Sequence, residues 1–171
     1  MQQSRIADLQ YQQVTASTTA FKQQLHPGFA CGVLTTVEAA KFLADQNIST
    51  SGTIIPADSP TAASRRGSPR LDSCSYSAVA NNVSYIDIII KTYNDTATAK
   101  DAFTKDTQGV LYAEQGSFAD GTTTSVYSSG VNYIVRDRVV YEISASKPGA
   151  TGGSELKAFS DSVAVYILQK L

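Results

Sequence analysis

The sequence predicts an α+β fold, in which an antiparallel sheet of about five to six strands has helices packed on it as an α/β sandwich. Three observations predict this class. Segments that alternate apolar and polar residues follow one another as hairpins, and segments with helical spacing separate the hairpins. The chain has two cysteines, Cys31 just ahead of the first helix of the domain and Cys74 at the start of its first long strand. Its length of 171 residues suits one domain with a proper core.

The first segment of the chain predicts a helix. Residues 4–25 are polar, rich in Gln and Thr, and contain neither Gly nor Pro, with sparse apolar positions among them. This helix is either a stalk ahead of the domain or a helix packed on it. Pro27 and Gly28 end it, because proline cannot continue a helix and glycine permits a turn. We therefore expect an N-terminal helix or stalk over residues 1–28 and a single α+β domain over residues 29–171.

The domain begins with a helix and a long connection. Thr35 and Glu38 have the spacing of a capping box, which predicts a helix from Thr35 to about Gln46. We expect Ala40 and Ala44 on its buried side, with Val37 and Phe42 nearby. Residues 47–71 contain three prolines and many Ser and Thr residues, so they predict a loop in which Ile54 and Ile55 form a short strand.

Strands and two helices make up the rest of the domain. Ile86, Ile88 and Ile90 share one face of the strongest strand pattern. Asn94 and Asp95 are placed to cap the next helix, and Ser154 to cap the last one. The expected strands cover residues 74–79, 83–93, 122–128, 131–136 and 139–146, and residues 109–115 form either a short strand or irregular structure. The two helices run from Asp95 to about Asp106 and from Ser154 to Leu171.

Composition bounds the location and the partners of the chain. Charged residues make up 17%, below the usual ~25%, and the net charge is -1. Neither nucleic acid nor an anionic membrane is therefore an expected partner. The two cysteines predict one disulfide and an oxidising compartment. The alternative is a cytosolic protein with two reduced thiols. Because no apolar run resembles a signal peptide or membrane span, we expect any anchor to lie upstream of residue 1.

Two short motifs carry a family resemblance. The pattern Cys31-x-x-Leu34-Thr35-x-x-Glu38-Ala39-Ala40, followed by Cys74-Ser75-Tyr76, resembles the small secreted lipoproteins common in actinobacteria. It is also similar to the extracellular sensor domains of certain bacterial Ser/Thr kinases. The resemblance implies a PsbP-like sandwich with bonded cysteines, outside the cytosol. Two features depart from the pattern: the start of the chain has no lipobox cysteine, and an additional helix precedes the domain.

The sequence predicts no catalytic, cofactor or metal site. His26 is the only histidine, it lies beside Pro27, and no catalytic motif surrounds any serine. A zinc site needs three or four ligands, which one His and two distant Cys do not provide. We therefore expect a protein that is not an enzyme and that carries no cofactor.

A partner surface has two sequence candidates. Arg65, Arg66 and Arg70 form the only basic cluster, and a solvated loop is the alternative interpretation. The second candidate is a set of strand tyrosines that would share the outer face of the sheet, with core packing as the alternative. These tyrosines are Tyr85, Tyr133 and Tyr141.

The leading functional hypothesis is a non-enzymatic extracytoplasmic domain, a monomer that is at the cell surface, in the periplasm or secreted. It would bind an unknown protein or cell-envelope component through the tyrosine-bearing face or through residues 47–71. The alternative is a small-molecule or lipid carrier or sensor, with a cavity between the sheet and the helices. A third hypothesis is a hydrolase without a recognised motif, whose activity a broad substrate screen would reveal.

Overall fold

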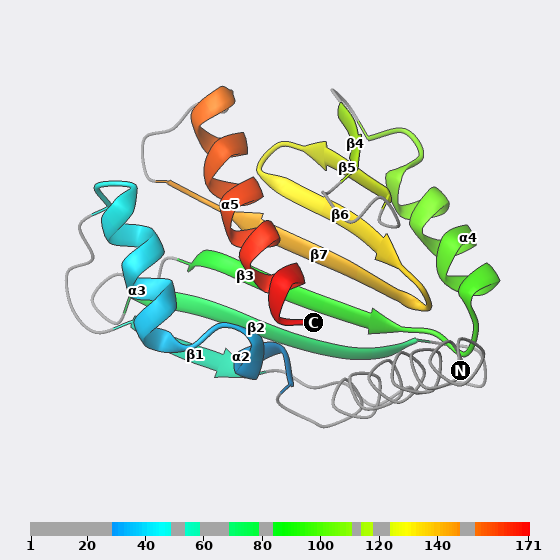
Figure 1. Cartoon of the computed structure of the whole chain (residues 1–171), viewed down its shortest axis with the longest axis horizontal. Helices are drawn as coiled ribbons and strands as arrows, with labels where there is room; N and C mark the ends of the chain where they lie inside the picture. The colour runs from blue at the N-terminus through cyan, green and yellow to red at the C-terminus, as the bar shows by residue number, and fades with distance from the viewer. Residues whose placement is uncertain are drawn as a thin grey trace, which may run out of the picture.

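The computed structural model describes residues 29–48, 54–58, 69–78, 84–110, 114–117, 124–147 and 153–171. Within these ranges one antiparallel sheet has the strand order β1-β2-β3-β7-β6-β5-β4, and four helices pack against it (Figure 1). The predicted α+β class with an antiparallel sheet is confirmed. The sheet is open and has seven strands, more than the sequence predicted.

The elements have the following bounds. The strands are β1 (Ile54–Asp58), β2 (Arg70–Ala78), β3 (Ser84–Thr92), β4 (Glu114–Ser117), β5 (Thr124–Ser128), β6 (Val131–Arg136) and β7 (Val139–Ala145). The helices are α2 (Phe29–Val33), α3 (Thr36–Asp45), α4 (Thr96–Thr107) and α5 (Ser154–Lys170). The helix predicted over residues 4–25 lies outside the described residues.

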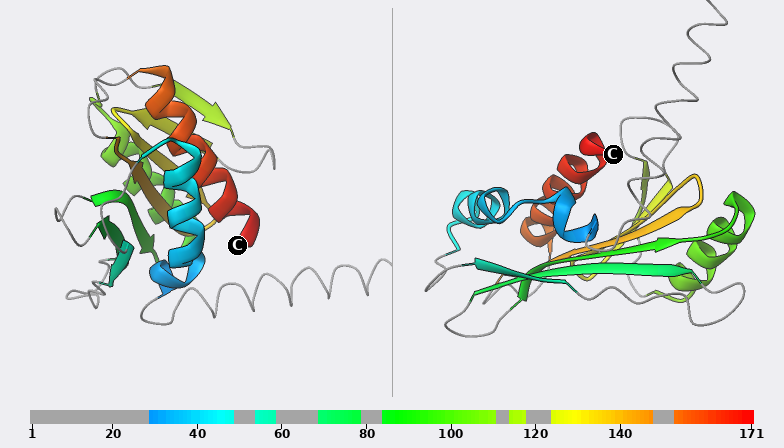
Figure 2. Two further views of the ribbon diagram at one scale, coloured as in Figure 1. Left: turned by 90° about the vertical axis from the view of Figure 1, so that its left-hand side faces the viewer. Right: turned by 90° about the horizontal axis from the view of Figure 1, so that it is seen from below.

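The two faces of the sheet have different cover. Helices α2, α3 and α5 lie on one face (Figure 2), which we call the helical face. The predicted isoleucine face of β3 is confirmed, because Ile86, Ile88 and Ile90 are buried there in the main core. Helix α4 packs on β6 and β7 from the opposite face, where a smaller core gathers. That core consists of Tyr93, Ala99, Phe103, Val126, Val135 and Val140.

Two of the three predicted helix caps are confirmed. The Thr35 hydroxyl accepts from the Glu38 amide at 3.3 Å while the Glu38 carboxylate accepts from the Thr35 amide at 2.7 Å, which is a complete capping box. Asp95 caps α4 by accepting from the Thr98 amide at 2.7 Å. The expectation for Ser154 was wrong. It is the first residue of α5, and the cap is Gly153, whose φ of 102° favours glycine.

The buried side of α3 also differs from the prediction. Ala39 and Leu43 are buried, whereas Ala40 and Ala44 are exposed. Val37 is 79% exposed. The helix contains alanines at neighbouring positions, so its apolar spacing does not fix its rotation. The contact of α3 with β1 decides which alanine faces inward.

Candidate functional site

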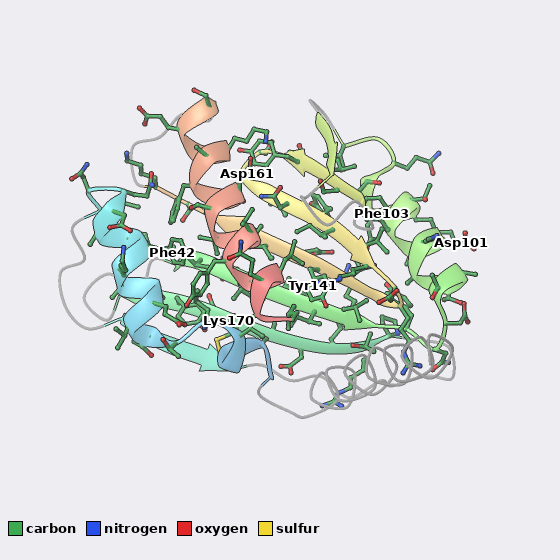
Figure 3. All side chains as sticks on the ribbon, viewed as in Figure 1. Phe42, Asp101, Phe103, Tyr141, Asp161 and Lys170 are labelled. Atoms are coloured by element: carbon green, nitrogen blue, oxygen red, sulfur yellow. A yellow bond between two sulfur atoms is a disulfide. The ribbon has the colours of Figure 1, made fainter. Side chains whose placement is uncertain are left out.

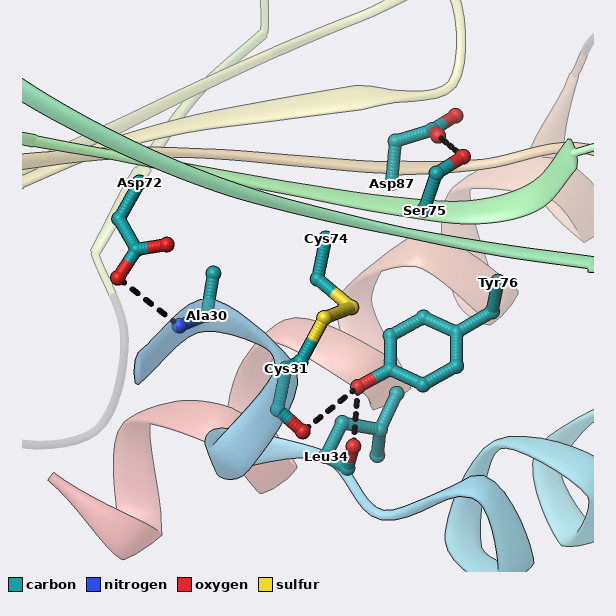
Figure 4. Close-up of a disulfide and its surroundings, with 8 residues drawn as sticks. All are labelled: Ala30, Cys31, Leu34, Asp72, Cys74, Ser75, Tyr76 and Asp87. Atoms are coloured by element: carbon teal, nitrogen blue, oxygen red, sulfur yellow. Dashed lines mark hydrogen bonds between the residues drawn. A yellow bond between two sulfur atoms is a disulfide. The ribbon is translucent and has the colours of Figure 1, made fainter. Parts of the chain in front are cut away.

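The predicted disulfide is confirmed and joins α2 to β2. The Cys31 and Cys74 sulfurs are 2.03 Å apart, and the two residues are 43 positions apart in the chain (Figure 4). Cys31 lies within α2 rather than ahead of the first helix, and Cys74 lies in the middle of β2 rather than at its start. The bridge is largely hidden, because Cys74 is 1% exposed.

Two further side chains of β2 hold α2. The Tyr76 hydroxyl, which is buried, donates to the backbone carbonyl of Leu34 and, at 3.3 Å, to that of Cys31 (Figure 4). Burial raises the pKa of Tyr76 well above its ordinary value, and the charge of Glu38 raises it further. The Asp72 carboxylate accepts from the Ala30 amide at 3.4 Å. The only sequence signal for this arrangement was that Asp72 and Tyr76 lie two positions before and after Cys74, which places the three side chains on one face of a strand.

We expect Tyr76→Phe to lower the free energy of unfolding by about 1–3 kcal/mol, because the carbonyls of Cys31 and Leu34 lose their buried donor. Denaturant unfolding monitored by circular dichroism measures this loss. Tyr133→Phe is the matched control, since Tyr133 is only half-buried. Equal losses in the two variants would contradict the role of the Tyr76 hydroxyl.

A second polar cluster joins α3 to α5. The Glu38 carboxylate accepts from Lys170 Nζ at 2.7 and 2.8 Å and from the Tyr166 hydroxyl. The Phe42 and Tyr166 rings meet edge to face at 5.3 Å, with Phe42 projecting from α3 towards α5 (Figure 3). The hydrogen bonds from Lys170 and Tyr166, then that from Thr35, lower the pKa of Glu38 from 4.5 to about 2.

This pKa predicts acid sensitivity with a defined sign. Because the folded pKa of Glu38 is lowered, its ionised form contributes stability that is complete above pH 4.5 and is lost as the pH falls towards about 2. The difference in melting temperature between the wild type and Glu38→Gln should therefore be largest near neutral pH and shrink through this window. Glu155→Gln is the control, since that side chain is 78% exposed and its lysine contact is 3.6 Å long. A difference that does not change with pH would contradict the prediction.

The structure does not assemble the predicted partner surface. Tyr85 and Tyr141 are 2% and 1% exposed, so these two belong to the core and the surface prediction was wrong for them. Tyr141 lies with Val139 and Ile143 in the main core because strand alternation puts these positions of β7 on the helical face.

The other members of the predicted surface do not lie together. Tyr133 on β6 is half-buried and packs on the core under α4. Arg70 begins β2 and is also half-buried, but the register with Thr92 and Val139 places it on the helical face. Arg70 and Tyr133 therefore point to opposite faces of the sheet. Arg65 and Arg66 lie outside the described residues.

A polar row crosses the face opposite the helical face. Ser75, Asp87 and Ser144 are paired in register across β2, β3 and β7. The Ser75 hydroxyl donates to one carboxylate oxygen of Asp87, and the Ser144 hydroxyl donates to the other at 3.4 Å. Figure 4 shows Ser75 and Asp87 on the side of the sheet away from the disulfide. No local sequence pattern indicated this row, because its members come from three strands.

An ion-pair cluster lies beside the polar row. Lys91 on β3 binds Glu142 on β7 and, at 2.8 Å, Asp106 on α4. Partial burial acts to lower the pKa of Lys91, but the hydrogen bonds that its ammonium group donates to Asp106 and Glu142 outweigh it, so the pKa is raised. Burial, then the charge of Glu142, raises the pKa of Tyr133. A lysine that stays charged is a poor nucleophile, so the cluster is suited to holding α4 on the sheet.

The polar row, the ion-pair cluster and Tyr133, which is paired with Glu142, together form what we call the polar face. It consists of Ser75, Asp87, Ser144, Lys91, Glu142, Asp106 and Tyr133. Its chemistry is a mixture of hydroxyl donors, carboxylate acceptors and one aromatic ring, which suits hydrogen bonding to a partner. Among the described residues, no group of three or more His, Cys, Asp or Glu side chains is placed to hold a metal ion.

No model of a protein family, no curated protein and no solved structure matches the chain. Within the described ranges, every helix is too short or too polar to cross a membrane.

Proposed function

We propose that the chain is a non-enzymatic extracytoplasmic domain that binds a protein or a cell-envelope component. The disulfide carries this proposal. Both cysteines of the chain are joined in one bridge whose Cys74 end is buried, and such bridges persist in oxidising compartments, whereas cytosolic thiols are kept reduced. The likeness of the Cys31 and Cys74 motifs to secreted lipoproteins and sensor domains leads to the same proposal.

The polar face is the proposed binding surface. Helix α4 packs on β6 and β7, and the polar row lies beside it on β2, β3 and β7. Half-buried hydroxyls, carboxylates and a tyrosine give such a surface the polar character of a transient protein interface.

We propose that the domain acts as a monomer. The edge strand β1 contains Pro56, which cannot donate a backbone hydrogen bond to another strand. The other edge, β4, has only four residues, and they are Glu114, Gln115, Gly116 and Ser117. Short, polar or proline-containing edges disfavour pairing between copies.

Thiol trapping in the native cells tests the location. Cells are lysed directly into a denaturant that contains a bulky maleimide reagent, and a parallel sample is reduced in denaturant before the reagent is added. We expect the two cysteines to react only after reduction, which a gel shift measures. Reaction of both cysteines without reduction would place the chain in a reducing compartment and refute the extracytoplasmic assignment.

Binding to intact native cells tests the surface. The labelled chain is compared with Asp87→Ala and Tyr133→Ala, which we expect to bind less than the wild type while circular dichroism stays unchanged. Val165→Ala is the control, because this residue is exposed on α5, over the helical face. Equal binding by all variants would exclude the polar face. A co-purified lipid in native mass spectra would instead favour the carrier hypothesis.

A further inference from the structure

Three alternate residues of β2 hold α2 in place along its length. Asp72 holds the amide of Ala30, Cys74 is bonded to Cys31, and Tyr76 holds the carbonyls at the end of the helix (Figure 4). All three side chains, and Ala30 itself, are at most 3% exposed. A five-residue helix has few internal hydrogen bonds, so these contacts with β2 set its position.

The contacts between β2 and α2 lie at the point where the preceding chain joins the domain. Residues 1–28 lead directly into α2, which begins at Phe29. We infer that α2 is the mechanical anchor of the domain, so that tension applied through residues 1–28 passes across the sulfur bridge into β2. This inference holds whether or not the polar face binds a partner.

The disulfide changes which elements of the fold carry the applied force. Helix α3 and strand β1 lie between Cys31 and Cys74, inside the closed loop of 43 residues, and are therefore bypassed. β1 is an edge strand paired only with β2, whereas β2 is paired with both β1 and β3. An edge strand can be peeled off one hydrogen bond at a time. Removing β2 requires breaking the hydrogen bonds on both of its sides.

Oxidised and reduced chains should therefore unfold differently under force. In the reduced chain, tension reaches α2, α3 and β1 in turn, and we expect stepwise unfolding that starts at low force. In the oxidised chain we expect one event at a higher force. The fully stretched oxidised chain should be shorter by about 150 Å, the extended length of the 43 residues that the bridge closes off.

Optical-trap unfolding of the full chain, held at residue 1 and at Leu171, tests the inference. A second attachment site separates the mechanical role from general stabilisation. When the chain is held at Gln108, an exposed residue after α4, and at Leu171, tension does not cross the bridge. We expect reduction to lower the unfolding force much more in the first geometry than in the second. An equal loss in both geometries would overturn the inference.

The non-covalent contacts give a second test. Tyr76→Phe should lower the force of the first unfolding step of the reduced chain. Without the disulfide, the hydrogen bonds of the Tyr76 hydroxyl are among the contacts that still hold α2 on β2. In the oxidised chain the same change should leave the number of unfolding events at one. Early low-force steps in the oxidised wild type would show that the bridge does not shield α3 and β1, and would overturn the inference. The Cys31→Ser/Cys74→Ser variant repeats the reduced measurement without a reductant.

Discussion

Replacing both cysteines by serine is expected to lower the free energy of unfolding by about 4 kcal/mol, because the unfolded chain regains the entropy of a closed loop of 43 residues. For a domain of this size the loss corresponds to a fall in melting temperature of about 10 °C. Scanning calorimetry of the wild type and of Cys31→Ser/Cys74→Ser measures both quantities.

The reduced wild type provides the control for this measurement, since it lacks the bond but keeps both sulfur atoms. We expect it to match the double serine variant within error. A double variant that is as stable as the oxidised wild type would mean that the cross-link does not stabilise the fold. The hydrogen bonds of Asp72 and Tyr76 with α2 would then be sufficient to hold this helix on β2.

Phe159→Ala is expected to lower the free energy of unfolding by about 3–5 kcal/mol. Phe159 is the first apolar position of α5 that is fully buried, and it lies in the main core with Ile143 and Tyr141 of β7. The change removes an aromatic ring from the interface of helix and sheet and leaves a cavity. Guanidinium unfolding at constant pH measures the loss.

The matched change on the outer side of the same helix is Val165→Ala, at a residue that is 39% exposed. It should cost well under 1 kcal/mol, because little apolar surface leaves water there on folding. A similar cost for the two variants would mean that α5 does not pack on the sheet as described. This pair of variants therefore tests the helical face, while the cysteine variants test the connection between α2 and β2.

Much of the fold could be predicted because its signals are local. Ile86, Ile88 and Ile90 occupy every second position of their segment, which places them on one face of a strand. The Thr35 and Glu38 pair marks the start of α3 without reference to the rest of the chain. For β4 the sequence left a short strand and irregular structure both open over residues 109–115, since the strand from Glu114 to Ser117 has no apolar alternation. Its conformation comes from pairing with β5.

The site could be predicted only in part, because its contacts join distant positions. The burial of Tyr141 could have been deduced from its parity with Val139 and Ile143. The contacts of Asp87 with Ser144 and of Glu38 with Lys170 could not, since they depend on the strand order and on how α5 crosses the sheet.

The interior also contains a polar contact that no periodic pattern indicates. The buried amide of Asn132 donates to Ser160 at 2.8 Å and to Asp161 at 3.1 Å, which ties β6 to α5. An asparagine on a strand and a serine on a helix are ordinary surface residues by composition.

The strand order has a consequence for how the chain emerges from the ribosome. β3 pairs with β7, which is synthesised on the order of fifty residues later, so the first half of the sheet waits with β3 as an unpaired edge. Part of the cover of Ile86, Ile88 and Ile90 is missing during that interval, since α5 is the last of these elements to be made. A nascent chain in this state is a substrate for chaperones that shield apolar strands, and slowing translation between residues 93 and 138 should lengthen its dependence on them.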